Sequence, residues 1–178
     1  PVALALEEMG MTRSNGTTLF ANAPTEQVDA STFETKESME KAGKPFSPAR
    51  YALITGDVRL SPDNDADIKK VTNDANKDGS QVKAILISKA AAEGIDLKCI
   101  RQVHILEPWY TMSRIEQIIG RAVRNFSHIL LPFEERNVEI FLHGSILSDQ
   151  ERETTDMYIY RLAEYKAKQI GEISRLLK

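Results

Sequence analysis

Short apolar runs alternate with helix-forming segments along much of this chain, and that alternation limits the folds open to it. One run, Lys83–Ser88 (KAILIS), is almost continuously apolar, which is typical of a parallel strand buried on both faces. Further strand-like runs are Tyr51–Thr55, Arg101–Leu106 and Val138–His143. Because helical segments separate these strands, the sequence predicts an α/β fold built on a parallel sheet.

One helix is expected before the strand-like run Tyr51–Thr55 in the sequence, and another after it. Val2–Met9 has a helical pattern, and Gly10 is placed to cap its C-terminal end. A second helix is expected from about Ser61 to Ala75, with a proline in a position that a first turn tolerates.

The last 31 residues, 148–178, are expected to form one helix or two broken ones. Ser148 and Glu151 have the spacing of a capping box at its start. An apolar seam follows at helical spacing, made of Ile159, Ala163, Ile170, Ile173 and Leu177.

Residues 22–50 differ from the rest of the chain. They are polar, mix both charge signs and contain Pro24, Pro45 and Pro48. A loop of this length inside a compact domain is usually functional or disordered. We therefore expect a flexible insertion, with some helix around Phe33–Ala42.

Composition excludes several classes of protein. With 178 residues, 42% of them hydrophobic, the chain can form one domain, or one domain plus an appendage. Its net charge of −3 provides no global basic field, so any binding to nucleic acid must come from a local groove. The single cysteine, Cys99, excludes an internal disulfide framework and fits a reducing compartment. No run of about 18 apolar residues is present, so no membrane span is expected.

The segment Ser113–Arg124 (SRIEQIIGRAVR) carries the strongest local pattern in the chain. Ser113 and Glu116 are spaced as a capping box at a helix start. An apolar stripe at the helical period comprises Ile115, Ile118, Ile119, Ala122 and Val123. The opposite face, at positions i, i+3, i+4 and i+7, comprises Gln117, Gly120, Arg121 and Arg124.

This pattern predicts a helix that is buried along one side and presents two guanidinium groups and an amide in the same direction. Gly120 leaves a gap in the polar face, where another group can approach closely. The planar forks of the two arginines match phosphate oxygens. A surface helix with solvated arginines remains the alternative, because most amphipathic helices carry such a charged face.

The spacing Q-x-x-G-R-x-x-R resembles motif VI of superfamily 2 helicases and translocases. In that family the arginines of the motif reach across a cleft to the γ-phosphate of ATP bound on a neighbouring domain. The resemblance implies that Gln117, Arg121 and Arg124 are catalytic, with the two arginines stabilising charge on the transferring phosphoryl group.

The segment Ile85–Leu97 (ILISKAAAEGIDL) is similar to motif V of the same superfamily. A short hydroxyl and exposed backbone amides in a loop after a strand can hold a phosphate, whereas a carboxylate suits a ribose hydroxyl or orients an arginine. The resemblance implies cofactor contacts from Glu93, Gly94 and Asp96, and nucleic-acid contacts from Ser88, Lys89, Thr55 and Gly56. Taken alone, this segment is more typical of a plain strand-to-helix loop, and its position about 25 residues before Q-x-x-G-R-x-x-R is what makes the pair of motifs specific.

The match extends through Arg101–Trp109 (RQVHILEPW), and residues 51–170 resemble the helicase-like ATPases of large cytoplasmic DNA viruses. These are the poxvirus early-transcription and nucleoside-triphosphatase group and their giant-virus relatives. The resemblance implies a RecA-like helicase C-terminal domain over residues 1–147 and a helical extension over residues 148–178. We interpret His104 as a strand histidine hydrogen-bonded to a neighbour, and Trp109 as a packing anchor.

The sequence has no G-x-x-x-x-G-K-[ST] phosphate loop and no strand that ends in an Asp-Glu pair. The resemblance then implies that ATP and Mg²⁺ are held mainly by an N-terminal RecA-like domain of the same polypeptide, and that this fragment alone is inactive. DNA or RNA would be the second partner, in the host cytoplasm or the virion, and no membrane is involved. The alternative is a non-catalytic RecA-like binding module in a viral transcription or virion complex.

Overall fold

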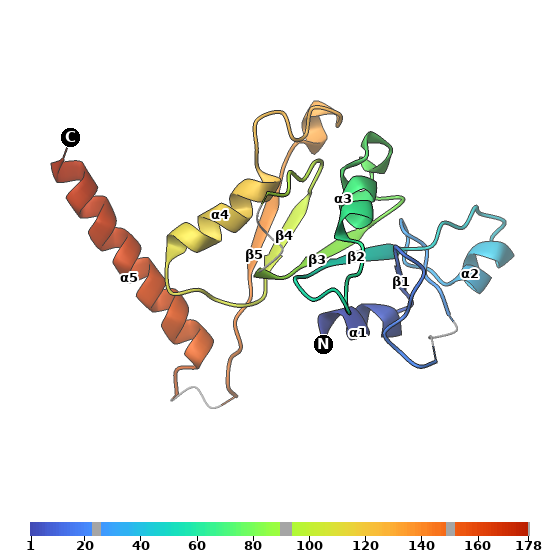
Figure 1. Ribbon diagram of the computed structural model, residues 1–178, viewed down its shortest axis with the longest axis horizontal. Coiled ribbons are helices and arrows are strands. Elements are labelled where there is room, and N and C mark those ends of the chain that lie inside the picture. Colours follow the sequence, from blue (N-terminus) through green and yellow to red (C-terminus); the bar gives the residue numbers. More distant parts are fainter. Residues whose placement is uncertain (23–25, 90–93, 149–151, 178) are drawn as a thin grey trace. The chain divides into compact units, whose positions relative to one another are not determined.

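The computed structural model describes residues 1–22, 26–89, 94–148 and 152–177 (Figure 1). The chain divides into two compact units, Pro1–Lys98 and Cys99–Lys178. Each unit contains parallel strands flanked by helices, so the predicted α/β fold class is confirmed. The proposed domain boundary between residues 147 and 148 stays a prediction, and it differs from the division between the two units.

The first unit is built on a three-stranded parallel sheet in the order β1-β2-β3. Its strands are β1 (Thr12–Arg13), β2 (Arg50–Ile54) and β3 (Ala84–Ile87). Its helices are α1 (Val2–Glu8), α2 (Lys36–Lys41), α3 (Asn64–Thr72) and the short 3₁₀ helix η1 (Asp74–Asn76).

The central strand of this sheet is β2, in which residues 51–54 are all buried. β3 pairs with it in parallel, so that Leu53 lies opposite Leu86. All four residues of β3 are only partly buried. The expectation of a strand at Lys83–Ser88 is confirmed, but the expected burial on both faces belongs to β2, because β3 is the last strand of this sheet.

A buried carboxylate joins α1 to the core of the first unit. The Tyr51 hydroxyl, which is fully buried, donates to Glu7 Oε1 at 2.6 Å. The Thr18 hydroxyl and the Leu19 backbone N–H also donate to Glu7, at 2.7 and 2.9 Å. Burial raises the pKa of Glu7, but the hydrogen bonds from Tyr51 and Thr18 outweigh it and hold the pKa below its usual value.

Residues 26–50 are folded, which corrects the expectation of a flexible insertion for this part of the segment. The buried Asp29 carboxylate accepts backbone N–H groups of Ser31, Thr32 and Ser47. Short bridges pair Val28 with Thr35 and Asp29 with Pro48. The predicted helix is present as α2, and its Met39 is buried.

The helix ends in the first unit follow local side-chain chemistry. α1 ends at Glu8 and is followed by Gly10 at φ +93, so the predicted glycine cap is confirmed. α3 begins after Asp63, whose carboxylate accepts the Ala66 N–H at 2.9 Å. It ends earlier than expected, at Thr72, and η1 completes the segment.

The second unit contains a parallel pair of strands, β4 (Gln102–Ile105) and β5 (Glu139–Leu142). Its helices are α4 (Met112–Ala122), the 3₁₀ helix η3 (Phe133–Glu135) and α5 (Thr155–Leu176). α4 contacts β4 on one side and α5 on the other (Figure 1). The residues buried between these elements include Ile105, Ile115, Ala122, Ile159 and Ala163.

α5 is a single helix of 22 residues that starts later than predicted. Its N-cap is Thr154, whose hydroxyl accepts the Met157 N–H. The predicted capping box is therefore wrong at Ser148, and Glu151 lies outside the described residues. Only the first part of the expected seam is buried, since Ile170, Ile173 and Leu177 are exposed. No helix in the described ranges is both long and apolar enough to cross a bilayer.

Candidate functional site

α4 starts and ends differently from the prediction. Its N-cap is Thr111, and Ser113 lies inside the helix with its Oγ donating to Thr111 Oγ1, so the predicted capping box of Ser113 and Glu116 is wrong. The helix ends at Ala122, because the backbone leaves the helical region at Val123. Val123, which the apolar stripe was expected to bury, is half exposed at 50%.

Three of the four residues on the predicted polar face remain on the helix. Gln117 is exposed, whereas Gly120 and Arg121 are half-buried in the last turn. A Cβ atom built on Gly120 would meet no atom within 4 Å, so open space lies beside it. Among the described residues, the Arg121 guanidinium makes no hydrogen bond or ion pair. The aliphatic stem of Arg121 is packed while the guanidinium keeps access to water, which leaves that group able to meet a ligand.

Arg124 lies beyond the helix, in the turn that follows it. Its Nε donates back to the Gly120 carbonyl at 3.1 Å, and its side chain is exposed. The turn itself is held by Ser127, whose hydroxyl accepts the Arg124 N–H at 3.3 Å and lies 2.8 Å from His128 Nδ1. His128 Nε2 donates to the Ile100 carbonyl at 2.7 Å, which ties this turn to the start of β4.

Sequence reasoning placed all of these arginine contacts on one helix and missed the role of Ser127 and His128. A hydroxyl residue three positions after an arginine, followed by a histidine, only weakly predicts a stabilised turn. The turn is tied in place by the contact of His128 with Ile100, which is distant in sequence and is brought close only by the fold.

The loop after β3 contains the predicted motif V residues. The Ser88 N–H donates to the Ile54 carbonyl at 3.0 Å, which extends the ladder between β2 and β3. Ser88 Oγ is buried and has no hydrogen-bond partner among the described residues. Lys89 is exposed. A buried hydroxyl without a partner is uncommon and calls for an explanation such as a ligand or an ordered water.

The second part of this loop is anchored by alternate residues. Ile95 and Leu97 are buried, so Asp96 between them is exposed. Gly94 has φ +80, a conformation that favours glycine. Glu93, the third residue that the resemblance places near the nucleotide, lies outside the described residues.

The turn after β2 holds Thr55 and Gly56. The Thr55 N–H donates to Ser61 Oγ at 3.0 Å, and the two hydroxyls are 2.8 Å apart. The Asn64 side chain donates to the Thr55 carbonyl at 2.8 Å. The Thr55 hydroxyl is therefore already engaged within the turn, whereas Gly56 is exposed. Ser61 and Asn64, which shape this turn, were not singled out from the sequence.

The predicted residues fall into groups that belong to different units. Gln117, Arg121 and Arg124 lie in the second unit, and the residues near Thr55, Ser88 and Gly94 lie in the first. Within the first unit, the Ser88–Ile54 hydrogen bond places the end of β3 beside the end of β2. Both turns therefore leave the sheet at the carboxyl ends of neighbouring parallel strands, where ligands bind in such sheets.

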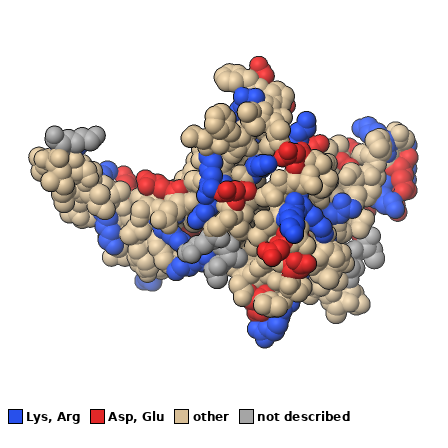
Figure 2. Space-filling model, turned by 45° about the horizontal axis from the view of Figure 1, so that its top comes forward, with Lys and Arg blue, Asp and Glu red and all other residues tan. Residues whose placement is uncertain are grey.

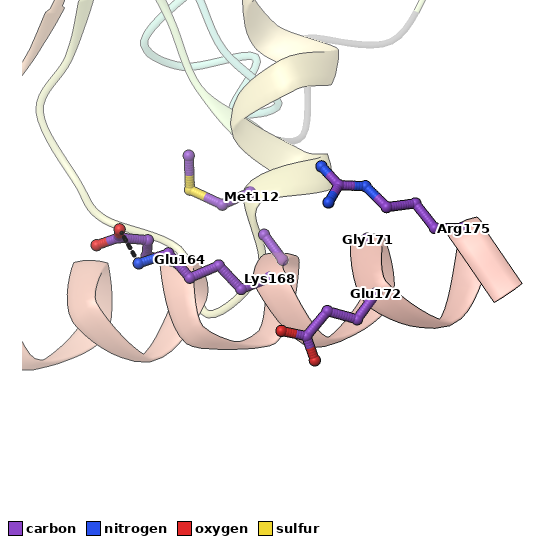
Figure 3. Close-up of a pocket in the computed structure, with 7 residues that line it drawn as sticks. Met112, Glu164, Lys168, Gly171, Glu172 and Arg175 are labelled. Atoms are coloured by element: carbon purple, nitrogen blue, oxygen red, sulfur yellow. Dashed lines mark ion pairs between the residues drawn. The ribbon is translucent and has the colours of Figure 1, made fainter.

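Two cavities among the described residues are lined by other side chains. A groove of about 410 Å³ runs beside α5 in the second unit (Figure 3). Its lining residues are Met112, Glu164, Ala167, Lys168, Gly171, Glu172 and Arg175. A cavity of about 190 Å³ in the first unit is lined by residues of α1, β1 and the segment after it. On the face shown in Figure 2, basic and acidic side chains are interspersed, in keeping with the small net charge.

Comparison with known proteins gives a consistent group of relatives. Over 127 residues the chain is 42% identical to "Putative ATP-dependent RNA helicase R350" of Acanthamoeba polyphaga mimivirus, which covers 67% of this chain and 16% of that protein. It is 41% identical over 101 residues to "Termination factor NPH-I homolog" of African swine fever virus, covering 57% and 14% of the two chains. It is 34% identical over 114 residues to "Nucleoside triphosphatase I" of Heliothis armigera entomopoxvirus, covering 64% and 17%.

These three relatives are viral proteins, and the chain spans less than a fifth of the length of each. The match therefore supports a viral origin and a helicase or nucleoside-triphosphatase family, as the resemblance of the two motifs implied. Residues 5–126, which include both motif regions, match the family described as "Helicase conserved C-terminal domain". This chain is a member of the helicase C-terminal domain family, which has a RecA-like fold.

Proposed function

We propose that this chain is the second motor domain of an ATP-dependent nucleic-acid helicase or translocase. In this proposal it supplies Arg121 and Arg124 to ATP held by a preceding RecA-like domain of the same polypeptide. The observation that carries the proposal is the state of Arg121, which is half-buried on a packed helix and makes no ion pair within the described ranges.

The support for Arg121 comes from the way α4 is packed. Ile115 and Ala122 are buried, at 1% and 2% exposure, so the helix backbone is fixed on the side opposite the arginine. The open space beside Gly120 gives a phosphate or another domain room to approach. A guanidinium held on a rigid element, next to an open approach, is suited to stabilising charge that develops on a phosphoryl group.

Arg124 is suited to the same task by a different route. Its Nε is bonded to the Gly120 carbonyl, and this bond fixes the direction of the guanidinium relative to α4. When bound, ATP with Mg²⁺ would supply the phosphoryl group and the charge that its transfer develops. Gln117, Arg121 and Arg124 would bind and orient that group, and the exposed Asp96 and Gly94 would contact the nucleotide.

Nucleic acid would bind at the carboxyl ends of β2 and β3. The Ser88 hydroxyl, which has no partner in the described part of the chain, and the exposed Lys89 and Gly56 can each contact a backbone phosphate, with no reading of base sequence. The Thr55 hydroxyl, being bonded to Ser61, would instead hold the turn in shape. Cycles of domain closure around ATP would then move the protein along the bound nucleic-acid strand.

Several parts of the proposal concern the whole protein. Among the described residues, no group of three or more histidines, cysteines, aspartates or glutamates is placed to hold a metal ion. The sequence has no phosphate loop and no strand ending in an Asp-Glu pair, and in this proposal the preceding domain holds Mg²⁺ and the fragment alone hydrolyses little ATP. A viral motor of this kind would act in the host cytoplasm or the virion.

The experiment compares arginine variants of the full-length protein in nucleic-acid-stimulated ATP hydrolysis. Arg121→Ala and Arg124→Ala are each expected to lower kcat by a factor of about 10³ or more. Arg114→Ala is the matched control, because Arg114 lies on the same helix, is also half-buried and belongs to neither motif. Its kcat is expected to stay near that of the wild type.

Three results would count against the proposal. The first is wild-type-like kcat in both Arg121→Ala and Arg124→Ala. The second is an equal loss in Arg114→Ala, which would indicate a general effect on α4. The third is a full-length protein that folds and binds its partners without hydrolysing ATP, which would favour the non-catalytic binding module.

A further inference from the structure

Two of the three histidines in the chain meet on one face of the β4–β5 pair. His104 lies in β4, and His143 directly follows β5. His104 Nδ1 and His143 Nε2 are 3.0 Å apart, and both side chains are exposed. The interpretation of His104 as a strand histidine bonded to a neighbour is thus confirmed, and the neighbour is a second imidazole.

A chain of hydrogen bonds favours one tautomer of the His104 ring. Glu139 Oε2 accepts from Gln102 Nε2 at 2.9 Å, which turns the amide oxygen of Gln102 away from the carboxylate. That oxygen lies 3.4 Å from His104 Nε2 and can only accept. The His104 tautomer with its proton on Nε2 satisfies this contact and leaves the lone pair of Nδ1 facing His143.

Both rings are held in place by further contacts. The His104 ring stacks on Phe141, with centroids 4.6 Å apart and planes 6° apart. The backbone N–H of His143 donates to the Ile105 carbonyl at 3.0 Å. The backbone carbonyl of His143 accepts from the Tyr160 hydroxyl of α5, also at 3.0 Å. The two histidines are therefore held by the β4–β5 hydrogen bonds and by a contact with α5, which gives the pair a rigid support.

The geometry points to a binding site for a divalent transition-metal ion, chelated by His104 Nδ1 and His143 Nε2. Two nitrogens bound at about 2.0–2.1 Å to one tetrahedral zinc ion stand roughly 3.3 Å apart, close to the separation seen here. Imidazole nitrogens favour Zn²⁺, Ni²⁺ and Cu²⁺ over Mg²⁺ and Ca²⁺. The remaining positions around the ion would be filled by water.

The exchange of ligands balances without a redox step. In the metal-free pair, His143 Nε2–H donates to the His104 Nδ1 lone pair. When the ion binds, the proton of His143 moves to Nδ1 of the same ring, and both facing nitrogens present lone pairs. Two nitrogen–metal bonds replace one hydrogen bond and two water ligands of the ion.

The test measures metal binding by the full chain after treatment with a chelator. Calorimetric titration with ZnCl₂ is expected to show one saturable site, and MgCl₂ under the same conditions is expected to show none. His104→Ala and His143→Ala should each abolish the site. Gln102→Ala should weaken binding by about tenfold, because it removes the group that favours this tautomer of His104.

The wild-type protein contains its own control in His128, whose two ring nitrogens are bonded to Ser127 and Ile100. In imidazole NMR spectra, Zn²⁺ should shift the signals of His104 and His143 and leave those of His128 in place. The proposal is overturned if Zn²⁺ does not bind saturably, if His128 alone responds, or if a folded His143→Ala variant binds as well as the wild type. The NMR result decides the matter even if that variant fails to fold.

Discussion

Asp29 shows how a single side chain can order a polar segment. Its buried carboxylate gathers backbone N–H groups from residues 31, 32 and 47, which brings the two ends of the 26–50 segment together. The N–H of Ser47, then that of Ser31, lowers the pKa of Asp29 from 3.8 to about 2. The carboxylate therefore stabilises the fold only while it is ionised.

Asp29→Asn is expected to destabilise the first unit at neutral pH and to remove part of its acid sensitivity. The lowered pKa means that the stabilisation is present above pH 3.8 and is lost as the pH falls toward about 2. Urea unfolding midpoints measured across this range should fall more steeply for the wild type than for Asp29→Asn. Asp65→Asn, at an exposed position of α3, is the control and should unfold like the wild type.

At the scale of elements, the positions of the four expected strands were predicted well from the sequence, whereas the starts of the helices were predicted less well. All four predicted strands are present, with ends within one residue of those expected, because continuous apolar runs between polar turns leave little choice of position. The capping predictions failed where several hydroxyl residues compete. Thr111 lies two positions from Ser113, and Thr154 lies six from Ser148, so the sequence alone does not choose between them.

The order of residues 26–50 could not be predicted for a different reason. The contacts that stabilise this segment join Asp29 to Ser47 and Val28 to Ala49, which are far apart in sequence. Proline content and mixed charge report on local preference and carry no information on such pairings. The same limit applies to Ser61 near Thr55 and to the pairing of His104 with His143.

α4 offers a prediction that separates helix stability from function. Gly120→Ala should stabilise the fold by up to about 1 kcal/mol, because alanine favours the helix and its Cβ meets no atom within 4 Å. In the full-length protein the same change should lower ATP hydrolysis, if a phosphate or another domain approaches there. Thermal unfolding of the chain and steady-state kinetics of the full-length protein are the two measurements.

Gly171→Ala is the matched control for this experiment. Gly171 lies within α5, and a Cβ there also meets no atom within 4 Å. The gain in stability should be similar, whereas the kinetics should stay unchanged. If Gly120→Ala gains stability without any loss of activity, the space beside Gly120 has no role in catalysis.

At the scale of the whole molecule, the net charge of −3 limits how nucleic acid can bind. Long-range attraction is weak for such a chain, so in the proposed function its affinity would come from a few local contacts at the ends of β2 and β3. Among the described residues, the proposed phosphate contacts are two small residues, Ser88 and Gly56, and one positively charged residue, Lys89.

Lys89→Ala in the full-length protein is expected to weaken binding to unrelated nucleic-acid sequences to the same extent. If Lys89 contacts one phosphate, the slope of log affinity against log salt should fall by about 1. Fluorescence anisotropy with two oligonucleotides at several salt concentrations measures both quantities. Lys77→Ala, at an exposed lysine after η1, is the control. An unchanged slope in Lys89→Ala would remove this residue from the interface.

The end of α4 at Ala122 has a consequence for how the two arginines can vary. Arg121 belongs to a packed helix, whereas Arg124 lies in a short turn that His128 ties to Ile100, and its Nε bond to the Gly120 carbonyl holds its side chain against α4. Loss of the His128–Ile100 hydrogen bond would make the position of the Arg124 guanidinium more variable, while that of Arg121 would stay the same. In the proposed motor domain, a residue that never meets the nucleotide would in this way alter the rate of ATP hydrolysis while leaving the fold intact.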